Sequence, residues 1–433
     1  MNYCKVAGAA VFALFAAVPV WAQTVTVLPS KPGGVYAAGE KIVWNIGVAE
    51  DATGVVQSVH YRLKRGGGRV VAEGDTVLTG GAGRIETSPG EPMAYLMEVS
   101  TTGADGKAIR VFGGAAVEPT KIKPSAPRPK DFDAFWKAKL AELAAVPMNP
   151  VVTAGDSGRE GVEYGQVKLG NIGGATVHTQ LARPKTGTKF PAIIVLQWAG
   201  VYGLPKQNVT GYAAKGWLAL NVMAHDLPLD ESPEFYKKQN ETTLRDYINI
   251  GNRSRDTSYF LRMILGCYRA SEYLMSRPDW DGRILVASGT SQGGLQSIAL
   301  TGLQPKVTAM TVNVPAGCDH AGVPDGRGVS WPYYAVTGSD KAVLQTSSYF
   351  DAIHFASRIR VPSLIGVGLL DQTSAPSGVF AMANQIPVAK EMVILPLSDH
   401  QGQGGFQTPY YQRADAWLSD LQKGKSVPIR SGL

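Results

Sequence analysis

The stretch "GTSQGG" at residues 289–294 holds a serine in a setting that can make it a nucleophile. Gly289, Ser291 and Gly293 have the spacing G-x-S-x-G. The apolar run "RILVASG" predicts a strand before the motif, and "LQSIALTGL" predicts a helix after it. A strand–G-x-S-x-G–helix unit raises the serine hydroxyl above a sheet, where it can attack a carbonyl carbon. A plain glycine-rich turn fits the motif but does not explain its position between a strand and a helix.

The two glycines of this motif have a steric role. The turn is so sharp that the serine takes a strained backbone conformation, and a Cβ at 289 or 293 would collide with the neighbouring strand or helix. The hydroxyl of Ser291 then lies at a helix N-terminus, whose dipole favours the negative charge that develops during attack.

A nucleophilic serine needs a base, and the base needs an acid that orients it. In α/β-hydrolases the chain order is serine, then aspartate or glutamate, then histidine. The predicted strand "LIGVGLLD" ends at Asp371, and "MVILPLSDH" places His400 in the loop after the next strand. Of the six histidines only His400 follows Asp371. We therefore predict a Ser291–His400–Asp371 triad, with Asp399 as the minor alternative for the acid.

The oxyanion of an acyl-transfer intermediate needs backbone N–H donors. We predict the N–H of Gln292 as one donor and an N–H from the loop "QWAGVYG", residues 197–203, as the other. Ala199 is the predicted donor in that loop, with Trp198 as the next candidate. Trp198 and Tyr202 are interpreted either as walls of an acyl pocket or as packing residues.

Strands that alternate with helices from about residue 150 predict an α/β-hydrolase fold with a mostly parallel sheet. The apolar runs "PAIIVLQWAG" and "WLALNVMAHD" are typical of buried parallel strands. "VEYGQVKLG" and "ATVHTQLARP" predict an antiparallel pair, and "DTSYFLRMILGCYRASEYLMSR" predicts a helix.

The rest of the chain divides by composition. Residues 1–22 have the pattern of a signal peptide, so we predict a secreted or periplasmic protein. Short alternating runs over residues 23–118 predict a small β-sandwich-like domain, and residues 119–130 predict a proline-rich linker. The α/β-hydrolase catalytic domain is expected over residues 131–433, beginning with a helix that has Asp131 as its N-cap.

Composition argues against several other functions. The net charge of +7 is spread without a run of five or six basic residues, so no nucleic-acid partner is expected. The apolar run near the N-terminus is too short for a stable span, so no membrane insertion is expected after signal removal. Cys267 and Cys318 are predicted to be free thiols, and no metal site or organic cofactor is expected, because acyl transfer needs only the groups named above.

Four segments resemble the acetyl xylan esterase and cephalosporin C deacetylase family over about residues 125–425. They are "RPKDFDAFWKAKLAEL", "ASEYLMSRPDWDGRILVASGTSQGG", "PKVTAMTVNVPAGCD" and "GLLDQTSAPSGVFAMANQI". The resemblance implies an α/β-hydrolase that removes acetyl groups from hydroxylated sugars through a serine acyl-enzyme. It implies the same three residues, Ser291, Asp371 and His400, as the triad.

Three positions depart from the pattern of that family. Its Arg-Gly-Gln motif is replaced by "HDLPLD", residues 225–230, its His-Gly by Gln197-Trp198, and its His-Glu by His400-Gln401. These differences leave the oxyanion loop, the substrate and the formation of a homo-oligomer open. The segment at about 227–256 is interpreted equally as a cap over the site or as a surface excursion.

The sequence thus predicts a serine esterase for acetylated sugars such as xylo-oligosaccharides. Two alternatives stay open: an esterase or peptidase for a bulkier acyl group, and a non-catalytic carbohydrate-binding protein. The three triad positions argue against the second, because a binding scaffold has no need of them.

Overall fold

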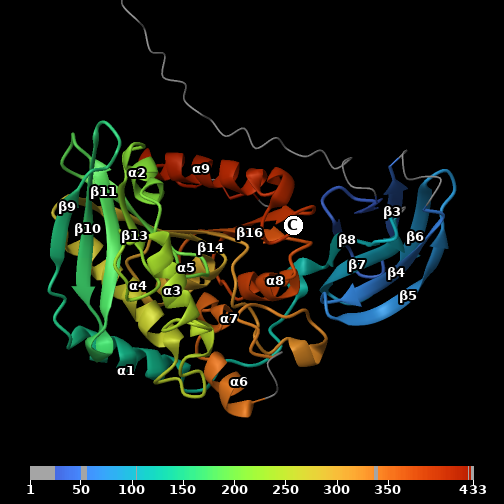
Figure 1. The fold of residues 1–433 in the computed structure, drawn as a ribbon, viewed down its shortest axis with the longest axis horizontal. Coiled ribbons are helices and arrows are strands. Elements are labelled where there is room, and N and C mark those ends of the chain that lie inside the picture. The colour runs from blue at the N-terminus through green and yellow to red at the C-terminus, as the bar shows by residue number, and fades with distance from the viewer. Residues whose placement is uncertain (1–24, 50–55, 104, 336–339, 428, 431–433) are drawn as a thin grey trace, which may run out of the picture.

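The computed structural model describes residues 25–49, 56–103, 105–335, 340–427 and 429–430 (Figure 1). The predicted signal peptide, residues 1–22, lies outside the described residues. Three sheets are present in the described part, with three, five and nine strands. Figure 1 shows the two smaller sheets at one end of the molecule and the nine-stranded sheet with its helices in the remainder. Within these described ranges, no helix combines the length and the apolar character that a membrane crossing requires.

The two smaller sheets form an N-terminal β-rich region. Their strand orders are β1–β3–β6 and β2–β8–β7–β4–β5. The strands are β1 (Val25–Pro29), β2 (Val35–Tyr36), β3 (Ile42–Val48), β4 (Ser58–Arg65), β5 (Arg69–Val77), β6 (Ala82–Thr87), β7 (Met93–Thr102) and β8 (Ala108–Val117). Alternate side chains of both sheets, Trp44 and Met97 among them, are buried in one shared core. A β-rich region before the hydrolase fold, as predicted, is confirmed.

The nine-stranded sheet has the order β17–β16–β15–β14–β12–β13–β11–β10–β9. The strands are β9 (Val151–Gly155), β10 (Val162–Gly170), β11 (Thr176–Pro184), β12 (Phe190–Leu196), β13 (Leu218–Val222), β14 (Trp280–Thr290), β15 (Ala309–Asn313), β16 (Ser363–Gly368) and β17 (Lys390–Leu395). The pairings from β13 to β17 are parallel, and those of β9, β10 and β11 are antiparallel. The predicted antiparallel pair and the mostly parallel sheet of an α/β-hydrolase are both confirmed.

Helices cover both faces of this sheet. They are α1 (Phe132–Ala144), α2 (Gln207–Ala213), α3 (Pro233–Glu241), α4 (Tyr259–Ser276), α5 (Gln292–Leu303), α6 (Lys341–Ser347), α7 (Ala352–Ala356), α8 (Pro376–Asn384) and α9 (Thr408–Gln422). Because successive strand residues point to opposite faces, Ile193 packs with α2 and α9, whereas its neighbour Ile194 packs with α4 and α5. Figure 1 shows α2 and α9 on one side of the sheet and α4, α5, α7 and α8 on the other.

The start of α1 lies where the sequence predicted it, directly after Asp131. Asp131 does precede the helix, but its side chain makes no N-cap hydrogen bond. Its carboxylate accepts hydrogen bonds from Arg255, at 2.6 Å, and from the hydroxyl of Tyr349 instead. Asp131 is therefore the N-cap residue, as predicted, but its carboxylate pairs with a guanidinium from a distant segment instead of a backbone N–H.

The β-rich region contacts the loop that follows β15. Gly67, in the turn between β4 and β5, forms a β-bridge with Arg327. On either side of it, the Gly328 N–H donates to the Gly66 carbonyl at 2.7 Å, and the Arg69 N–H donates to the Gly326 carbonyl at 3.0 Å. Arg327 is buried and its guanidinium donates to the carboxylate of Asp319. The turn is thus held by backbone hydrogen bonds around a buried ion pair.

The same region also contacts the loop that follows β16 and the start of α8. The Ala94 N–H of β7 donates to Ser377 Oγ at 3.3 Å. A Cβ placed on Gly114 of β8 would lie 2.6 Å from Leu369 Cβ, so only glycine permits this close approach. In addition, the Trp331 N–H donates to the Thr373 carbonyl at 2.8 Å. The loop between β16 and α8 is therefore packed against β7, β8 and the loop after β15.

Candidate active site

Ser291 lies in the sharp turn between β14 and α5. Its φ of 57° and ψ of −122° are in a strained region for a residue with a side chain. A Cβ on Gly289 would lie 2.3 Å from the backbone of Gly293, and a Cβ on Gly293 would lie 2.1 Å from the carbonyl oxygen of Leu196. The turn is fixed by the Ser291 N–H, which donates to the Asn313 carbonyl at 3.0 Å. The structure thus has the geometry predicted for a nucleophile elbow.

The structure brings the three predicted triad residues together. Ser291 Oγ lies 2.8 Å from His400 Nε2, and His400 Nδ1 lies 2.7 Å from Asp371 Oδ2. A carboxylate only accepts, so Nδ1 carries the proton and Nε2 is left to accept from the serine hydroxyl. Asp399 is not part of this chain of hydrogen bonds, because its Oδ1 accepts from the Gly402 N–H at 2.8 Å.

The environment of Asp371 fixes its orientation. Its side chain is buried, and its Oδ1 accepts from the backbone N–H groups of Thr373 and Ser374 at 2.8 and 2.7 Å. Burial raises the pKa of Asp371 above its ordinary value, and the hydrogen bonds from His400 and the two N–H groups oppose that rise. The carboxylate thus has three donors and a single orientation toward the imidazole.

The loop of residues 197–203 is attached to α5 by two glutamine side chains. Gln292 Nε2 donates to the carbonyls of Gln197 and Trp198, both at 3.4 Å. Gln296 Nε2 donates to the Gln197 carbonyl at 2.8 Å. The side chain of Gln292 is fully buried, and this role is not predictable from the sequence motif, which indicates only its backbone N–H.

The backbone N–H groups of this loop are not equivalent. The Gly200 N–H donates to the hydroxyl of Tyr247 at 3.3 Å, and that hydroxyl donates to Gln292 Oε1 at 2.6 Å. In the described part of the chain, the Ala199 N–H has no acceptor. The Gln292 N–H belongs to the first turn of α5, where helix N–H groups lack intrahelical acceptors. Among the described N–H groups of residues 198–203, only that of Gly200 is occupied, so the predicted donors Ala199 and Gln292 are both compatible with binding an oxyanion.

His225, the first residue of "HDLPLD", is a further residue of this loop network. Its Nε2 lies 2.9 Å from the Gly200 carbonyl, and its Nδ1 lies 2.6 Å from the hydroxyl of Tyr259. Because a carbonyl only accepts, Nε2 carries the proton and Nδ1 accepts from Tyr259. Burial lowers the pKa of His225 to about 4, so it holds the loop as a neutral ring.

Neither His225 nor Tyr247 was found by sequence reasoning. Both lie within or next to the segment at about 227–256 that was interpreted as either a cap or a surface excursion. Tyr247 is buried against Gln292 and Gly200, so this part of the segment contacts the candidate site. The position of His225 just after β13, at the carboxyl edge of the sheet, could have indicated it, whereas no local signal indicates Tyr247.

Acidification is expected to destabilise the protein through His225. An unfolded histidine binds a proton near pH 6.5, whereas the folded pKa of His225 is about 4. The unfolded chain therefore binds more protons between these values, and stability is full above pH 6.5 and is lost as the pH falls toward 4. At about 1.4 kcal/mol per pH unit, the loss reaches about 3 kcal/mol.

Urea unfolding of the wild type and of His225→Gln at pH 7, 5 and 4 measures this effect. Glutamine retains an N–H donor for the Gly200 carbonyl but does not titrate. The variant should show less loss of stability on acidification than the wild type. An equal loss in both proteins would contradict the assignment to His225.

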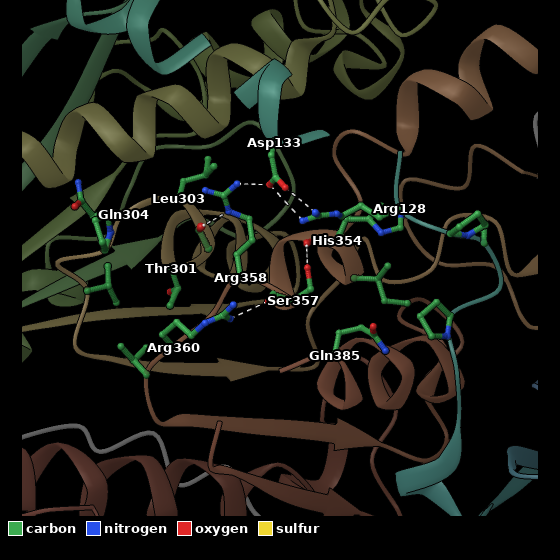
Figure 2. A pocket seen from close by; sticks show the side chains of 18 of the residues that line it. Arg128, Asp133, Thr301, Leu303, Gln304, His354, Ser357, Arg358, Arg360 and Gln385 are labelled. Carbon is green, nitrogen blue, oxygen red and sulfur yellow. Dashed lines mark hydrogen bonds and ion pairs between the residues drawn. The ribbon is translucent and has the colours of Figure 1, made fainter. Parts of the chain in front are cut away.

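A cavity of about 1340 Å³ lies at the opposite edge of the sheet and contains none of these residues (Figure 2). It is lined by the last turn of α5, which is about 18 Å from Ser291 along the helix. Figure 2 shows Arg128 and Arg358 meeting Asp133 from two sides. Arg358 Nε also donates to the Gly302 carbonyl at 2.8 Å. These arginines therefore stabilise a helix end and an ion-pair cluster.

The described residues also show where the cysteines and the potential metal ligands lie. They contain no group of three His, Cys, Asp or Glu side chains placed to hold a metal ion. Cys267 and Cys318 are both buried and are not bonded to each other. The Sγ of Cys267 donates to Gln296 Oε1 at 3.2 Å, and burial raises the pKa of this thiol.

Comparisons with known proteins give a consistent result. A sequence model of the family described as acetyl xylan esterase (AXE1) matches residues 117–421. The chain is 29% identical over 384 residues to the acetyl esterase Axe7A of Xylanibacter ruminicola, with 86% of each chain covered. That coverage is longer than residues 118–433, so it includes part of the N-terminal β-rich region.

Two solved structures are similar to this one. The acetyl xylan esterase from Paenibacillus sp. R4 has 22% identity and a TM-score of 0.59, covering 71% of this chain and 99% of that one. Acetyl xylan esterase 1 from Thermoanaerobacterium sp. JW/SL YS485 has 24% identity and a TM-score of 0.59, covering 68% of this chain and 96% of that one. At these identities the similarity shows a shared fold.

Proposed function

Because this chain belongs to the acetyl xylan esterase family and is a carboxylic ester hydrolase, we propose that it removes acetyl groups from acetylated sugars through a Ser291 acyl-enzyme. The observation that carries this proposal is the hydrogen-bonded chain from Ser291 Oγ through His400 to Asp371. Acetylated xylo-oligosaccharides are the proposed substrate class, and the family membership supports it. The signal-peptide pattern of residues 1–22 supports a site of action in the periplasm or outside the cell.

The first half of the reaction transfers the acetyl group to the enzyme. Ser291 Oγ attacks the acetyl carbonyl carbon while His400 Nε2 accepts the hydroxyl proton. Asp371 holds the imidazole tautomer and stabilises the imidazolium that forms. The N–H groups of Gln292 and Ala199 donate to the oxyanion, and His400 then gives its proton to the departing sugar alcohol.

The second half releases acetate. His400 Nε2 takes a proton from a water molecule, whose oxygen attacks the acetyl carbon on Ser291. The oxyanion again accepts hydrogen bonds from the two backbone N–H groups. The proton then returns from His400 to Ser291 Oγ as acetate leaves. Every group in these steps belongs to the chain itself.

The test is acetate release from acetylated xylo-oligosaccharides and hydrolysis of p-nitrophenyl esters of increasing acyl length, with Ser291→Ala beside the wild type. We expect release that depends on Ser291 and falls beyond the acetyl group. Activity that peaks on longer or aromatic acyl groups would reject acetyl preference and favour the bulkier-acyl alternative. Activity retained by Ser291→Ala would reject the nucleophile, and no turnover of any ester by the wild type would reject the proposal as a whole.

A further inference from the structure

Two exposed aromatic side chains are connected to Ser291 and His400. Among the large hydrophobic side chains exposed in the described residues, Trp198 is 55% exposed and Tyr411 is 48% exposed, and the others are aliphatic. Rings of this size are normally more buried than this, and exposed aromatic rings are enriched where a ligand is bound. Their exposure near the candidate site therefore indicates a ligand-binding role.

Trp198 is fixed at its backbone but not at its ring. Its carbonyl accepts hydrogen bonds from Gln292 Nε2 and from the hydroxyl of Tyr202, both at 3.4 Å. The Trp198 and Tyr202 ring centroids are 6.0 Å apart and their planes are inclined by 38°. Among the described residues the ring thus has one aromatic neighbour, and Trp198 as a whole is more than half exposed.

Tyr411, in the first turn of α9, is connected to both reacting residues. Its hydroxyl lies 3.4 Å from Asn313 Nδ2 and 3.4 Å from Gln407 Oε1. Asn313 accepts the Ser291 N–H at its carbonyl, and Gln407 Nε2 donates to the His400 carbonyl at 3.1 Å. A hydrogen-bonded neighbour therefore separates Tyr411 from each member of the Ser291–His400 pair.

The strand order places the two anchor points on opposite sides of Ser291. Trp198 follows β12, Ser291 follows β14, and Asn313 ends β15. These three strands are consecutive neighbours in the sheet, at about 4.8 Å per step. The Trp198 backbone and Asn313, whose side-chain amide contacts the Tyr411 hydroxyl, are thus separated by about 10 Å across the sheet, with the nucleophile between them.

We propose that Trp198 and Tyr411 are stacking platforms for pyranose rings of a xylo-oligosaccharide, one on each side of the sugar whose acetyl ester meets Ser291. This inference rests on the proposed function for the nature of the ester. The electron-rich faces of the two rings attract the polarised C–H groups on the apolar face of a pyranose. The arrangement selects an oligosaccharide over a single acetylated sugar, because the two platforms lie on either side of the nucleophile.

The cavity of Figure 2 is not an alternative location for such sugars. None of its lining residues is Phe, Tyr or Trp, and Arg128 and Arg358 are bound to Asp133, with Arg358 also bound to the end of α5. It therefore lacks the flat apolar surface that stacking requires.

The binding test uses full-length Ser291→Ala, which separates binding from turnover. Titration with xylohexaose is expected to change the tryptophan fluorescence and to give an affinity that falls about tenfold on addition of either Trp198→Ala or Tyr411→Ala. Trp198→Phe and Tyr411→Phe retain a ring and should recover most of the affinity. Val152→Ala, at an exposed position on β9 far along the sheet, is the matched control and should leave the affinity unchanged.

The kinetic test uses acetylated xylose, xylotriose and xylotetraose with the wild-type serine. The gain in kcat/KM with chain length should shrink in the two alanine variants through a higher KM, and the phenylalanine variants should restore it. If acetate release depends on Ser291 but the chain-length gain is unchanged in both alanine variants, the platforms are rejected and the proposed function stands. If no ester is hydrolysed but xylohexaose binding depends on the two rings, the platforms stand and the esterase mechanism is rejected.

Discussion

Replacing Asp371 with asparagine is expected to lower kcat by about 10,000-fold, the loss that the wrong imidazole tautomer causes in serine hydrolases of the same triad. In the wild type, Asp371 Oδ2 accepts the Nδ1 proton of His400 at 2.7 Å. Thr373 and Ser374 would hold the asparagine oxygen in place, so its amide N–H₂ would face Nδ1 and force the proton onto Nε2. The ring could then no longer accept the proton of Ser291.

Steady-state hydrolysis of p-nitrophenyl acetate measures this loss, with circular dichroism as the check on folding. Asp399→Asn is the matched control, since it changes the carboxylate next to His400 in sequence but outside the hydrogen-bonded triad. It should lower kcat less than about tenfold, because only a turn is affected. Similar losses in both variants would contradict the assignment of Asp371 as the acid.

Replacing Gly293 with alanine is expected to lower the free energy of unfolding by about 3 kcal/mol or more. The new Cβ would lie 2.1 Å from the Leu196 carbonyl oxygen and 2.9 Å from its carbonyl carbon. Both atoms are backbone at the end of β12, so α5 and the sheet must move apart. The same movement would displace Ser291 and Gln292 from the loop at 197–203, and esterase activity should fall with stability.

Gly211→Ala is the matched control for this change. Gly211 lies in α2, and a Cβ there meets no atom within 4 Å. Removing a helical glycine at an open position should raise the free energy of unfolding by up to about 1 kcal/mol. Urea denaturation of both variants measures the two effects, and a Gly293→Ala protein as stable as the wild type would show that the elbow does not need glycine.

The sequence was sufficient for the fold and the hydrogen-bonded triad because their signals are local. Apolar runs define the parallel strands, and Asp371 and His400 each follow one of them in the required chain order. Glycine is required at 289 and 293 because a Cβ there would clash with the backbone, and the short motif itself indicates this requirement. These features can be predicted from a few adjacent residues.

The residues that hold the oxyanion loop could not be predicted in this way. Tyr247 and His225 act through contacts with Gly200, and Gln292 acts through carbonyls nearly a hundred residues earlier. The periodicity of apolar residues along the sequence does not indicate such a contact, because each side chain is buried by a segment distant in sequence. The ion pair of Asp131 could not be predicted for the same reason, since its partner Arg255 lies 124 residues further along the chain.

The packing of the β-rich region against the loop of Asp371 has a consequence for how the chain folds. Arg65, beside the turn that meets Arg327, donates to the carbonyl of Asp325, 260 residues away. Contacts between such distant residues form late in folding, because the conformational entropy of the intervening chain must be lost first. During synthesis the β-rich region also leaves the ribosome long before its docking surface exists. Strands and helices should therefore form before the loop that contains Asp371 packs against the β-rich region. Catalytic competence should be among the last properties that the folding chain acquires.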